Sequence, residues 1–297
     1  VVAIRPSTTF VAALTVTAEN KTKTYGDANP VLTYTFGGFV LGEGEGVLDT
    51  GVTISTTALQ NSPVGGYPIT VSAAADANYT VSFVPGTLTV NQRPIQVTAD
   101  AKTKTYGDGD PAFTRALTAG SLVGGDAITG SLTRVAGENV GTYQIQQGSV
   151  TAGGNYALTY VPANLTINKA ALTIKANDAN RNFFQPNSAI NYSASFGNPV
   201  RGGLVGGDTP EEFAPVLEFS TDAVNGSPHG GVYKTMVTIS PANLAALPAS
   251  NYDITFADGV LTIQASAPTR NAVNALGKRL LVVYGRTTSI EIGRAHV

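Results

Sequence analysis

The sequence predicts an all-β chain of three small domains in tandem, each a β-sandwich of the immunoglobulin-like kind. A stretch that begins with Asn-Tyr and ends with Leu-Thr-Val or Leu-Thr-Ile occurs three times, at 78–90, 155–167 and 251–263. Its polar and apolar residues alternate, which is typical of half-buried strands. The chain is rich in Thr and Val, which favour strands, and in Gly, Asn and Pro, which favour turns.

Each copy of this stretch contains a turn signal in its middle. In the first copy Tyr79 and Val81 share one face, and Pro85-Gly86 supplies the turn before the alternation resumes. In the third copy the turn residues are Asp258-Gly259. Two alternating runs around a short turn predict a β-hairpin, which would be the last element of its repeat.

The elements of the first repeat follow one another in a simple order. A strand begins near Leu14, and the motif Lys23-Thr-Tyr-Gly-Asp27 follows it. Further strands are expected at 32–36 and 52–54, on either side of a glycine-rich loop that begins at 37. Six or seven short strands with frequent turns favour a sandwich, and a β-grasp-like sheet with one short helix is the alternative.

The second repeat carries the same motifs about 80 residues later. Lys104-Thr-Tyr-Gly-Asp108 matches the earlier Tyr-Gly motif, and Leu122-Val-Gly-Gly-Asp126 matches the glycine loop. The third repeat is divergent, because Asn182-Phe-Phe-Gln185 replaces the Tyr-Gly motif and a loop insertion is expected near 241–248. Asp126 and Asp208, which end the glycine loops, are candidates to N-cap a single helical turn.

The repeat length favours autonomous domains over a solenoid. We place the three repeats at 14–91, 95–168 and 172–264, with 1–13 as the end of a preceding segment and 265–297 as a linker and tail. The linkers between repeats are very short, so the domains are expected to form a semi-rigid rod.

The two ends of the chain suggest a fragment of a longer protein. The sequence starts without Met. Its last six residues, Ile292–Val297, resemble one reading frame of a sequencing-library adapter, so we exclude them from functional reasoning.

The composition excludes several classes of protein. The chain has 42% hydrophobic residues, which suffices for packed cores and argues against wholesale disorder. A net charge of −2 gives no electrostatic case for binding nucleic acid. The absence of cysteine excludes disulfides and thiolate metal sites, but not secretion. No apolar run approaches the about 18 residues that a membrane span needs.

Taken together, the repeated motifs resemble the MBG domain of the YGX type over roughly residues 14–264. The motifs are Lys-Thr-Tyr-Gly-Asp, Leu-Val-Gly-Gly-Asp, Val-Gly-x-Tyr and the Asn-Tyr stretch, although the third repeat has Phe183-Phe184 at the Tyr-Gly position. This family forms tandem arrays in large bacterial surface proteins, including filamentous-haemagglutinin-like adhesins. The resemblance implies a secreted or outer-membrane-associated location and a stalk or adhesion role, and it carries no catalytic residues.

No residue pattern predicts catalysis, and we assign no catalytic, cofactor-binding or metal-binding residue. His229 lies in a loop of Gly, Pro and Ser, and His296 lies in the excluded tail. A nucleophilic serine would need a base within hydrogen-bond reach, and no repeated Ser, His and Asp set is present. The glycine loops lack the Lys of a phosphate-binding loop, as Asp208 illustrates, so they are interpreted as turns.

Two weaker candidates are a calcium site and a sugar-binding surface. Asp27 with Asn29, and Asp108 with Asp110, offer only two of the six to eight oxygens that calcium takes, so capped turns are the simpler interpretation. Six recurrent tyrosines could stack on sugars, but their place in alternating strands favours the core, with the hydroxyl reaching backbone. They are Tyr67, Tyr143, Tyr233, Tyr79, Tyr156 and Tyr252.

The sequence therefore predicts a non-enzymatic stalk or adhesive segment of a bacterial surface adhesin. Host glycans, mucins or matrix proteins are the candidate external partners, and neighbouring domains of a longer chain are the candidate internal ones. Two alternatives remain open at this point. The repeats could themselves be a glycan-binding or protein-binding module, or they could flank an enzyme that lies outside this fragment.

Overall fold

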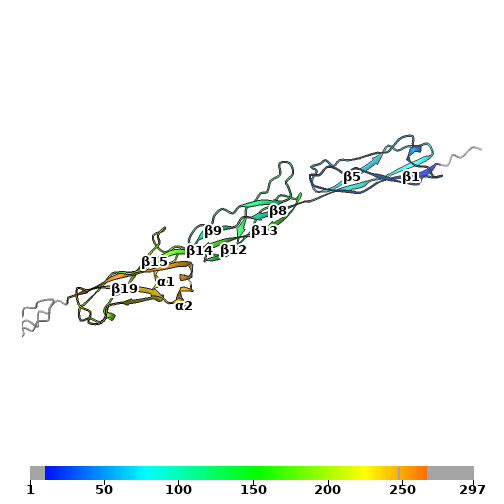
Figure 1. Ribbon diagram of the computed structural model, residues 1–297. Coiled ribbons are helices and arrows are strands. Elements are labelled where there is room, and N and C mark those ends of the chain that lie inside the picture. Colours follow the sequence, from blue (N-terminus) through cyan, green and yellow to red (C-terminus); the bar gives the residue numbers. More distant parts are fainter. Residues whose placement is uncertain (1–10, 247, 266–297) are drawn as a thin grey trace, which may run out of the picture. The chain divides into compact units, whose positions relative to one another are not determined.

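The computed structural model describes residues 11–246 and 248–265, and these fold almost entirely into β-strands (Figure 1). The all-β prediction is confirmed. Each of the three repeats contains one three-stranded sheet and one four-stranded sheet, and the two sheets share a core. This arrangement is the sandwich rather than the β-grasp alternative.

Repeat one shows how the sequence builds this unit. Its sheets have the strand orders β3-β1-β6 and β2-β7-β5-β4. In β1 every second residue is buried, and Val16 packs with Ile69 and Leu88 of the other sheet at zero exposure. The strands are β1 Ala12–Ala18, β2 Lys21–Thr24, β3 Tyr34–Gly37, β4 Thr53–Thr56, β5 Gly65–Ser72, β6 Tyr79–Val84 and β7 Gly86–Asn91, with a 3-10 turn at Glu45–Val47.

Repeat two has the same topology. Its sheets are β10-β8-β13 and β11-β12-β14-β9. The strands are β8 Arg93–Ala99, β9 Lys102–Thr105, β10 Arg115–Ala119, β11 Thr133–Arg134, β12 Gly141–Gln146, β13 Tyr156–Val161 and β14 Ala163–Asn168.

Repeat three keeps both sheets, β17-β15-β20 and β16-β21-β19-β18, and adds short helices. The predicted insertion is present, because helix α2 and a 3-10 turn separate β19 from β20. The strands are β15 Ala170–Ala176, β16 Ala179–Asn182, β17 Ala194–Gly197, β18 Leu217–Thr221, β19 Val232–Ile239, β20 Tyr252–Ala257 and β21 Gly259–Gln264. The helices are α1 Pro210–Phe213 and α2 Pro241–Leu244, with 3-10 turns at Asn187–Ala189, Ala214–Val216 and Ala249–Asn251.

The predicted β-hairpin is wrong. Strands β6 and β7 follow one another through Pro85 but do not pair, because β6 lies parallel to β1 in one sheet and β7 lies between β2 and β5 in the other. Alternation specifies the buried face of a strand but not its neighbour. The chain thus changes sheets where Gly86 comes so close to β1 that an added Cβ would lie 2.8 Å from the carbonyl oxygen of Ala18.

The predicted helix N-caps are also wrong. In repeat three Thr209, and not Asp208, is the N-cap of α1, and it forms a capping box with Glu212. In repeat two no helix follows Asp126 within the described residues. Both aspartates instead accept hydrogen bonds from tyrosine hydroxyls, at 2.7 Å from Tyr156 and Tyr252 respectively.

Repeats one and two belong to one compact unit, and repeat three forms a second unit that begins at Ala170. No helix in the described part of the chain is long and apolar enough to cross a membrane. The adapter-like residues Ile292–Val297 and His296 lie outside the described residues.

Candidate functional site: the joint between repeats one and two

The Tyr-Gly motif of repeat one forms a tight turn at the end of that repeat from which the chain leaves. The amide of Asp27 donates to the carbonyl of Thr24 at 3.0 Å, and Gly26 has a φ of 84°. Only glycine adopts this left-handed region without strain. The amide of Tyr25 donates to the carbonyl of Asn91, the last residue of β7, at 2.9 Å. The turn is therefore fixed beside the linker to repeat two.

Repeat two offers a matching group of atoms, which we call the socket. It consists of the backbone amide of Val123, the hydroxyl of Tyr156 and the carboxylate of Asp126. The amide of Val123 donates to the Tyr156 hydroxyl at 2.8 Å, and that hydroxyl donates to Asp126 at 2.7 Å. The glycine loop and the Asn-Tyr motif, far apart in the sequence, thus meet at one point.

The turn binds in the socket through a second tyrosine. The Tyr25 hydroxyl donates to the same carboxylate oxygen of Asp126, at 3.0 Å. The rings of Tyr25 and Tyr156 pack edge to face with centroids 5.6 Å apart. Gly26 lies against Val123 so closely that an added Cβ would be 2.3 Å from a Val123 methyl. The glycine is thus required both for the turn and for the contact.

Polar contacts from the linker reinforce the joint. The Arg93 side chain donates from Nε to the carbonyl of Tyr25 at 2.7 Å and forms an ion pair with Asp27. On the other side, the amide of Val64 in repeat one donates to the Asn155 side chain of repeat two at 3.0 Å. These contacts hold the turn on both flanks.

A buried apolar cluster spans the two repeats beneath these hydrogen bonds. Tyr25 and Val90 come from repeat one, and Ile95 and Tyr156 come from repeat two. All four are at most 6% exposed. Partly buried residues surround them, namely Tyr67, Leu122, Val123, Ala152 and Leu158. The joint is therefore a small hydrophobic core with a polar rim.

Burial and the shared carboxylate perturb both tyrosines of the joint. Desolvation raises the pKa of Tyr25, and the hydrogen bond to Asp126 raises it further. The same two causes, in the same order, raise the pKa of Tyr156. Both hydroxyls are therefore held in their neutral, hydrogen-bond-donating form.

The socket recurs in the other two repeats. In repeat one the amide of Val40 donates to the Tyr79 hydroxyl at 3.1 Å, and that hydroxyl donates to Glu43 at 2.5 Å. In repeat three the amide of Val205 donates to the Tyr252 hydroxyl at 3.0 Å, and this hydroxyl donates to Asp208. The Asn-Tyr tyrosines are buried and reach backbone, as predicted, and they also bind an acidic side chain.

A buried cation lies two residues before the Tyr-Gly position in each repeat. Lys23 is buried and donates to the carbonyls of Asp27, Leu59 and Gln60 at 3.1, 2.7 and 3.0 Å. Burial lowers its pKa, which the Asp27 charge partly opposes. Arg181 fills the corresponding place in repeat three and donates to the carbonyls of Gln185 and Val224.

In repeat two the equivalent cation, Lys104, binds carboxylates instead of carbonyls. Its ammonium contacts Asp110 at 2.8 Å and Glu138 at 2.5 Å, and Arg134 pairs with the same two carboxylates. Burial lowers the pKa of Lys104, but the hydrogen bonds to Asp110 and Glu138 outweigh it, so the pKa is raised. These cations were missed from the sequence, although the recurrence of Lys23 at Lys104 was a visible signal.

The residues proposed as calcium ligands have protein partners in the structure. Asp110 binds Lys104 and Arg134, and Asp27 binds Arg93. The side-chain amide nitrogen of Asn29 donates to the carbonyl of Ala58 at 2.6 Å. Asp108 accepts a hydrogen bond from the amide of Thr105, as expected for a capped turn. Among the described residues no group of three His, Cys, Asp or Glu is placed to hold a metal.

The other sequence candidates are placed as follows. Tyr67, Tyr143 and Tyr233 are half-buried, and their hydroxyls donate to the carbonyls of Pro63, Asn139 and Pro228. The ring of His229 packs edge to face on Phe183, with centroids 5.7 Å apart.

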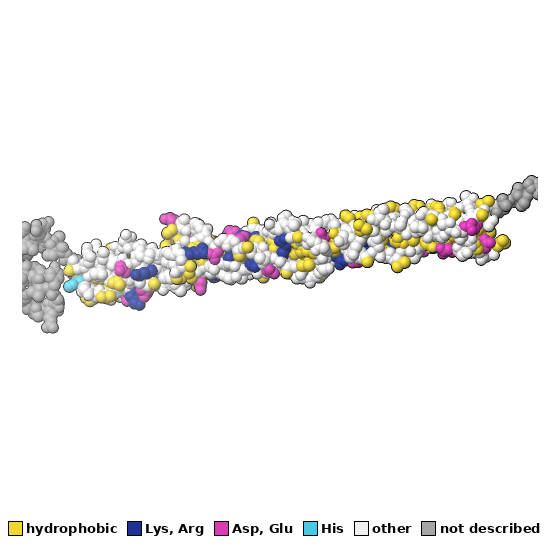
Figure 2. Space-filling view, turned by 90° about the horizontal axis from the view of Figure 1, so that it is seen from above, with side chains coloured by type: hydrophobic (Ala, Val, Ile, Leu, Met, Phe, Trp, Pro, Cys, Tyr) yellow, Lys and Arg dark blue, Asp and Glu magenta, His cyan; other side chains and the backbone are white. Residues whose placement is uncertain are grey.

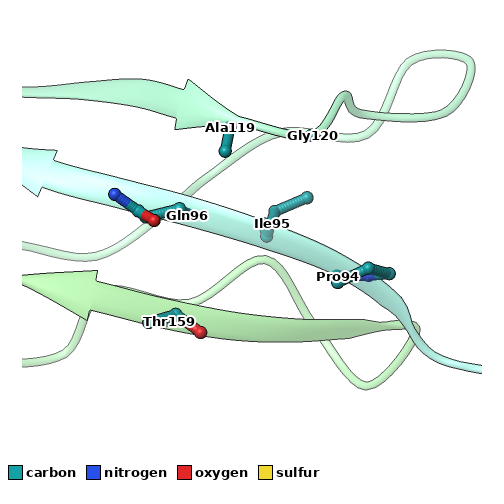
Figure 3. Close-up of a pocket in the computed structure, with 6 residues that line it drawn as sticks. All are labelled: Pro94, Ile95, Gln96, Ala119, Gly120 and Thr159. Atoms are coloured by element: carbon teal, nitrogen blue, oxygen red, sulfur yellow. The ribbon is translucent and has the colours of Figure 1, made fainter.

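One hollow lies on the surface of repeat two (Figure 3). Strands β8 and β13 line it together with the end of β10. The lining residues are Pro94, Ile95, Gln96, Ala119, Gly120 and Thr159. They include no charged group and only two polar side chains, which is fewer than the convergent polar groups that fix a ligand. On the face that Figure 2 presents, acidic and basic side chains are interspersed rather than gathered by sign.

Fold and joint together define a tandem array of β-sandwich repeats in which neighbouring repeats can interlock. The chain matches the family described as MBG domain (YGX type) over residues 14–89, 95–166 and 172–262. It belongs to this family, which forms repeat segments of extracellular surface proteins. Neither the family nor the all-β sandwich is typical of an enzyme.

Other comparisons add little to this assignment. A search of the curated proteins finds no match. Among solved structures, Drosophila N-cadherin EC1-3 is 9% identical with a TM-score of 0.21, and the alignment covers 84% of this chain and 98% of that one. The protocadherin Gamma B7 extracellular cadherin domains 1-4 are 8% identical with a TM-score of 0.21, covering 74% and 68%. The fold assignment rests on the sheets themselves.

Proposed function

We propose that this chain is a spacer segment of a secreted or cell-surface bacterial adhesin, and that it holds a binding region at a distance from the cell. The joint between repeats one and two is the observation that supports this proposal. A spacer needs neighbouring domains that do not fold back on one another. Here a turn, a socket and a cross-repeat core lock the two domains together.

Two further features agree with a spacer. The surface hollow beside β8 and β13 lacks convergent polar groups. Arg93, the first residue of β8, is itself part of the joint, so the short connection from β7 has little freedom to bend. Adhesive contacts by the repeats, if present, would be weak individually and would gain avidity from repetition.

The first experiment measures the distance between repeats one and two in solution. The chain has no cysteine, so labels can be attached to Thr35→Cys and Thr142→Cys, two exposed strand positions. We expect one narrow distance distribution by pulsed spin-label spectroscopy. Tyr25→Phe combined with Asp126→Ala should broaden it. A broad distribution in the chain with an intact joint would contradict the spacer proposal.

Small-angle scattering tests the length that a spacer requires. A compact globule of this many residues would have a radius of gyration of about 19 Å. The proposal requires a clearly larger value, and a value near the compact one would overturn it.

Separately, a folded chain covering 14–264 should not bind immobilised mucins, glycans or matrix proteins saturably. Such binding would favour a recognition module instead.

A further inference from the structure

We propose that the socket of repeat one binds the Tyr-Gly turn of another MBG repeat, presented from the N-terminal side as in the joint. This socket consists of the Val40 amide, the Tyr79 hydroxyl and the Glu43 carboxylate. The inference rests on the geometry of the joint and holds whether or not the array acts as a spacer.

The first support is that this socket is already formed. The hydrogen bonds from Val40 to Tyr79 and from Tyr79 to Glu43 reproduce those from Val123 to Tyr156 and from Tyr156 to Asp126. In repeat two the carboxylate accepts a second hydroxyl from the incoming turn. Carboxylate oxygens have room for several donors, so Glu43 can accept a second hydroxyl in the same way.

The second support is the apolar surface that this socket leaves exposed. Val123 is partly buried and lies against Gly26, whereas its counterpart Val40 is 44% exposed. Beside it Leu41 is 96% exposed. Val40 is therefore the exposed apolar contact of this socket, at the position that lies against Gly26 in repeat two.

The third support is the backbone of this loop, which has a left-handed residue at the same place in all three sockets. The φ of Leu41 is 58°, and the corresponding residues of the other two repeats are Gly124 and Gly206, with φ of 58° and 72°. The loop of repeat one is therefore already in the conformation that receives the turn in repeat two.

The direction of the joint between repeats one and two identifies the partner of the repeat-one socket. The donating turn lies at the end of its repeat where the chain leaves, and the socket lies at the end where the chain arrives. Repeats of this kind therefore associate in one direction only. The partner is a turn with a tyrosine hydroxyl, for Glu43, and a glycine, because a Cβ would clash with Val40 as it would with Val123.

The test is a four-repeat chain in which residues 11–92 are followed directly by residues 12–297, so that Ala12 takes the place of Arg93. Tyr25→Phe in the added repeat and Glu43→Gln in the original one complete a double-mutant cycle of unfolding. We expect the two residues to be coupled, by about fivefold in the unfolding equilibrium constant, as for one hydrogen bond. The same cycle at Tyr25 and Asp126 in the natural chain is the positive control.

The methyl resonances of Val40 give a readout independent of stability. They should shift in the four-repeat chain relative to the three-repeat chain. Gly26→Val in the added repeat should return them to their original positions, because the turn can no longer seat. Unshifted methyls, or a cycle without coupling at Glu43 while Asp126 shows it, would overturn the proposal.

Discussion

Asp126 is the residue on which the joint depends, because one of its oxygens accepts hydrogen bonds from two tyrosines of different repeats. Tyr156 belongs to the same repeat as Asp126, and Tyr25 belongs to the preceding one. Removing the carboxylate leaves both hydroxyls without their acceptor. Asp126 is itself exposed, so water can take the place of the carboxylate, and the cost is that of two partly buried hydrogen bonds to a charged group.

The joint should weaken in alkali. The raised pKa of Tyr25 and Tyr156 means that the folded chain holds both protons more tightly than the unfolded chain does. Their contribution to stability is therefore complete below about pH 10 and is lost as the pH rises through the folded pKa. Melting temperatures across this range should fall less steeply for Tyr25→Phe than for the natural chain.

A matched control is Tyr143→Phe, which removes a hydroxyl that donates to the carbonyl of Asn139 within its own repeat and lies outside the apolar cluster of the joint. In this variant the melting temperature should fall with rising pH as steeply as in the natural chain. If the melting temperatures of the natural chain and of Tyr25→Phe fall equally steeply with pH, the Tyr25 hydroxyl does not contribute to this loss of stability.

Lys104 offers a second prediction at the residue scale. Lys104→Met should destabilise repeat two by about 2 kcal/mol, because two hydrogen bonds to charged groups are lost. The pKa of Asp110 is lowered first by Arg134 and then by Lys104, so acid should also destabilise this repeat as the pH falls below about 4. Urea unfolding at pH 7 and pH 3 measures both effects.

The comparison variant is Lys104→Met with Asp110→Asn. Neutralising Asp110 removes a carboxylate that has lost its ammonium partner, so the double variant should be less destabilised than the sum of the singles. Strict additivity would mean that the two side chains act independently.

At the scale of elements, the point where the chain changes sheets constrains the sequence. In repeat three an added Cβ at Gly259 would lie 2.3 Å from the carbonyl oxygen of Ala176. The same position is Gly86 in repeat one and Ala163 in repeat two. The fold therefore accepts a methyl group at this position in one repeat, and the available space differs between repeats.

Alanine substitutions at the two glycines test this difference. Gly259→Ala should destabilise repeat three by about 1–3 kcal/mol, as overpacking does. Gly86→Ala should cost less, because its nearest backbone contact is 2.8 Å rather than 2.3 Å. Thermal unfolding of both variants decides the order, and equal losses would contradict this account.

The sequence predicted the strands well and their partners poorly. Alternation in 155–167 predicted two strands and their buried faces, and the structure contains β13 and β14 there. It could not show that these strands lie in different sheets, because pairing depends on residues distant in the chain. The joint was missed for the same reason, since Tyr25 and Asp126 are separated by most of two repeats. Their motifs were visible, but their contact was not.

At the scale of the whole molecule, repeats one and two should unfold together. Their shared core and hydrogen bonds make them one compact unit, with repeat three as another. Calorimetry should therefore show one transition for the first two repeats, and Asp126→Ala should split it. Asp258→Ala, which removes an exposed ion pair with Lys234, is the control and should not. Separate transitions for repeats one and two in the natural chain would show that the joint does not couple them.

The parallel pairing of first and last strands gives each repeat a particular response to tension. In repeat one β1 lies parallel to β6 and β2 lies parallel to β7, and the other repeats share this pattern. Pulling on the two ends of a repeat slides these strands lengthwise against each other. Their hydrogen bonds then bear the load together, in shear, instead of opening one after another. A chain built in this way should resist stretching far better than its modest cores suggest.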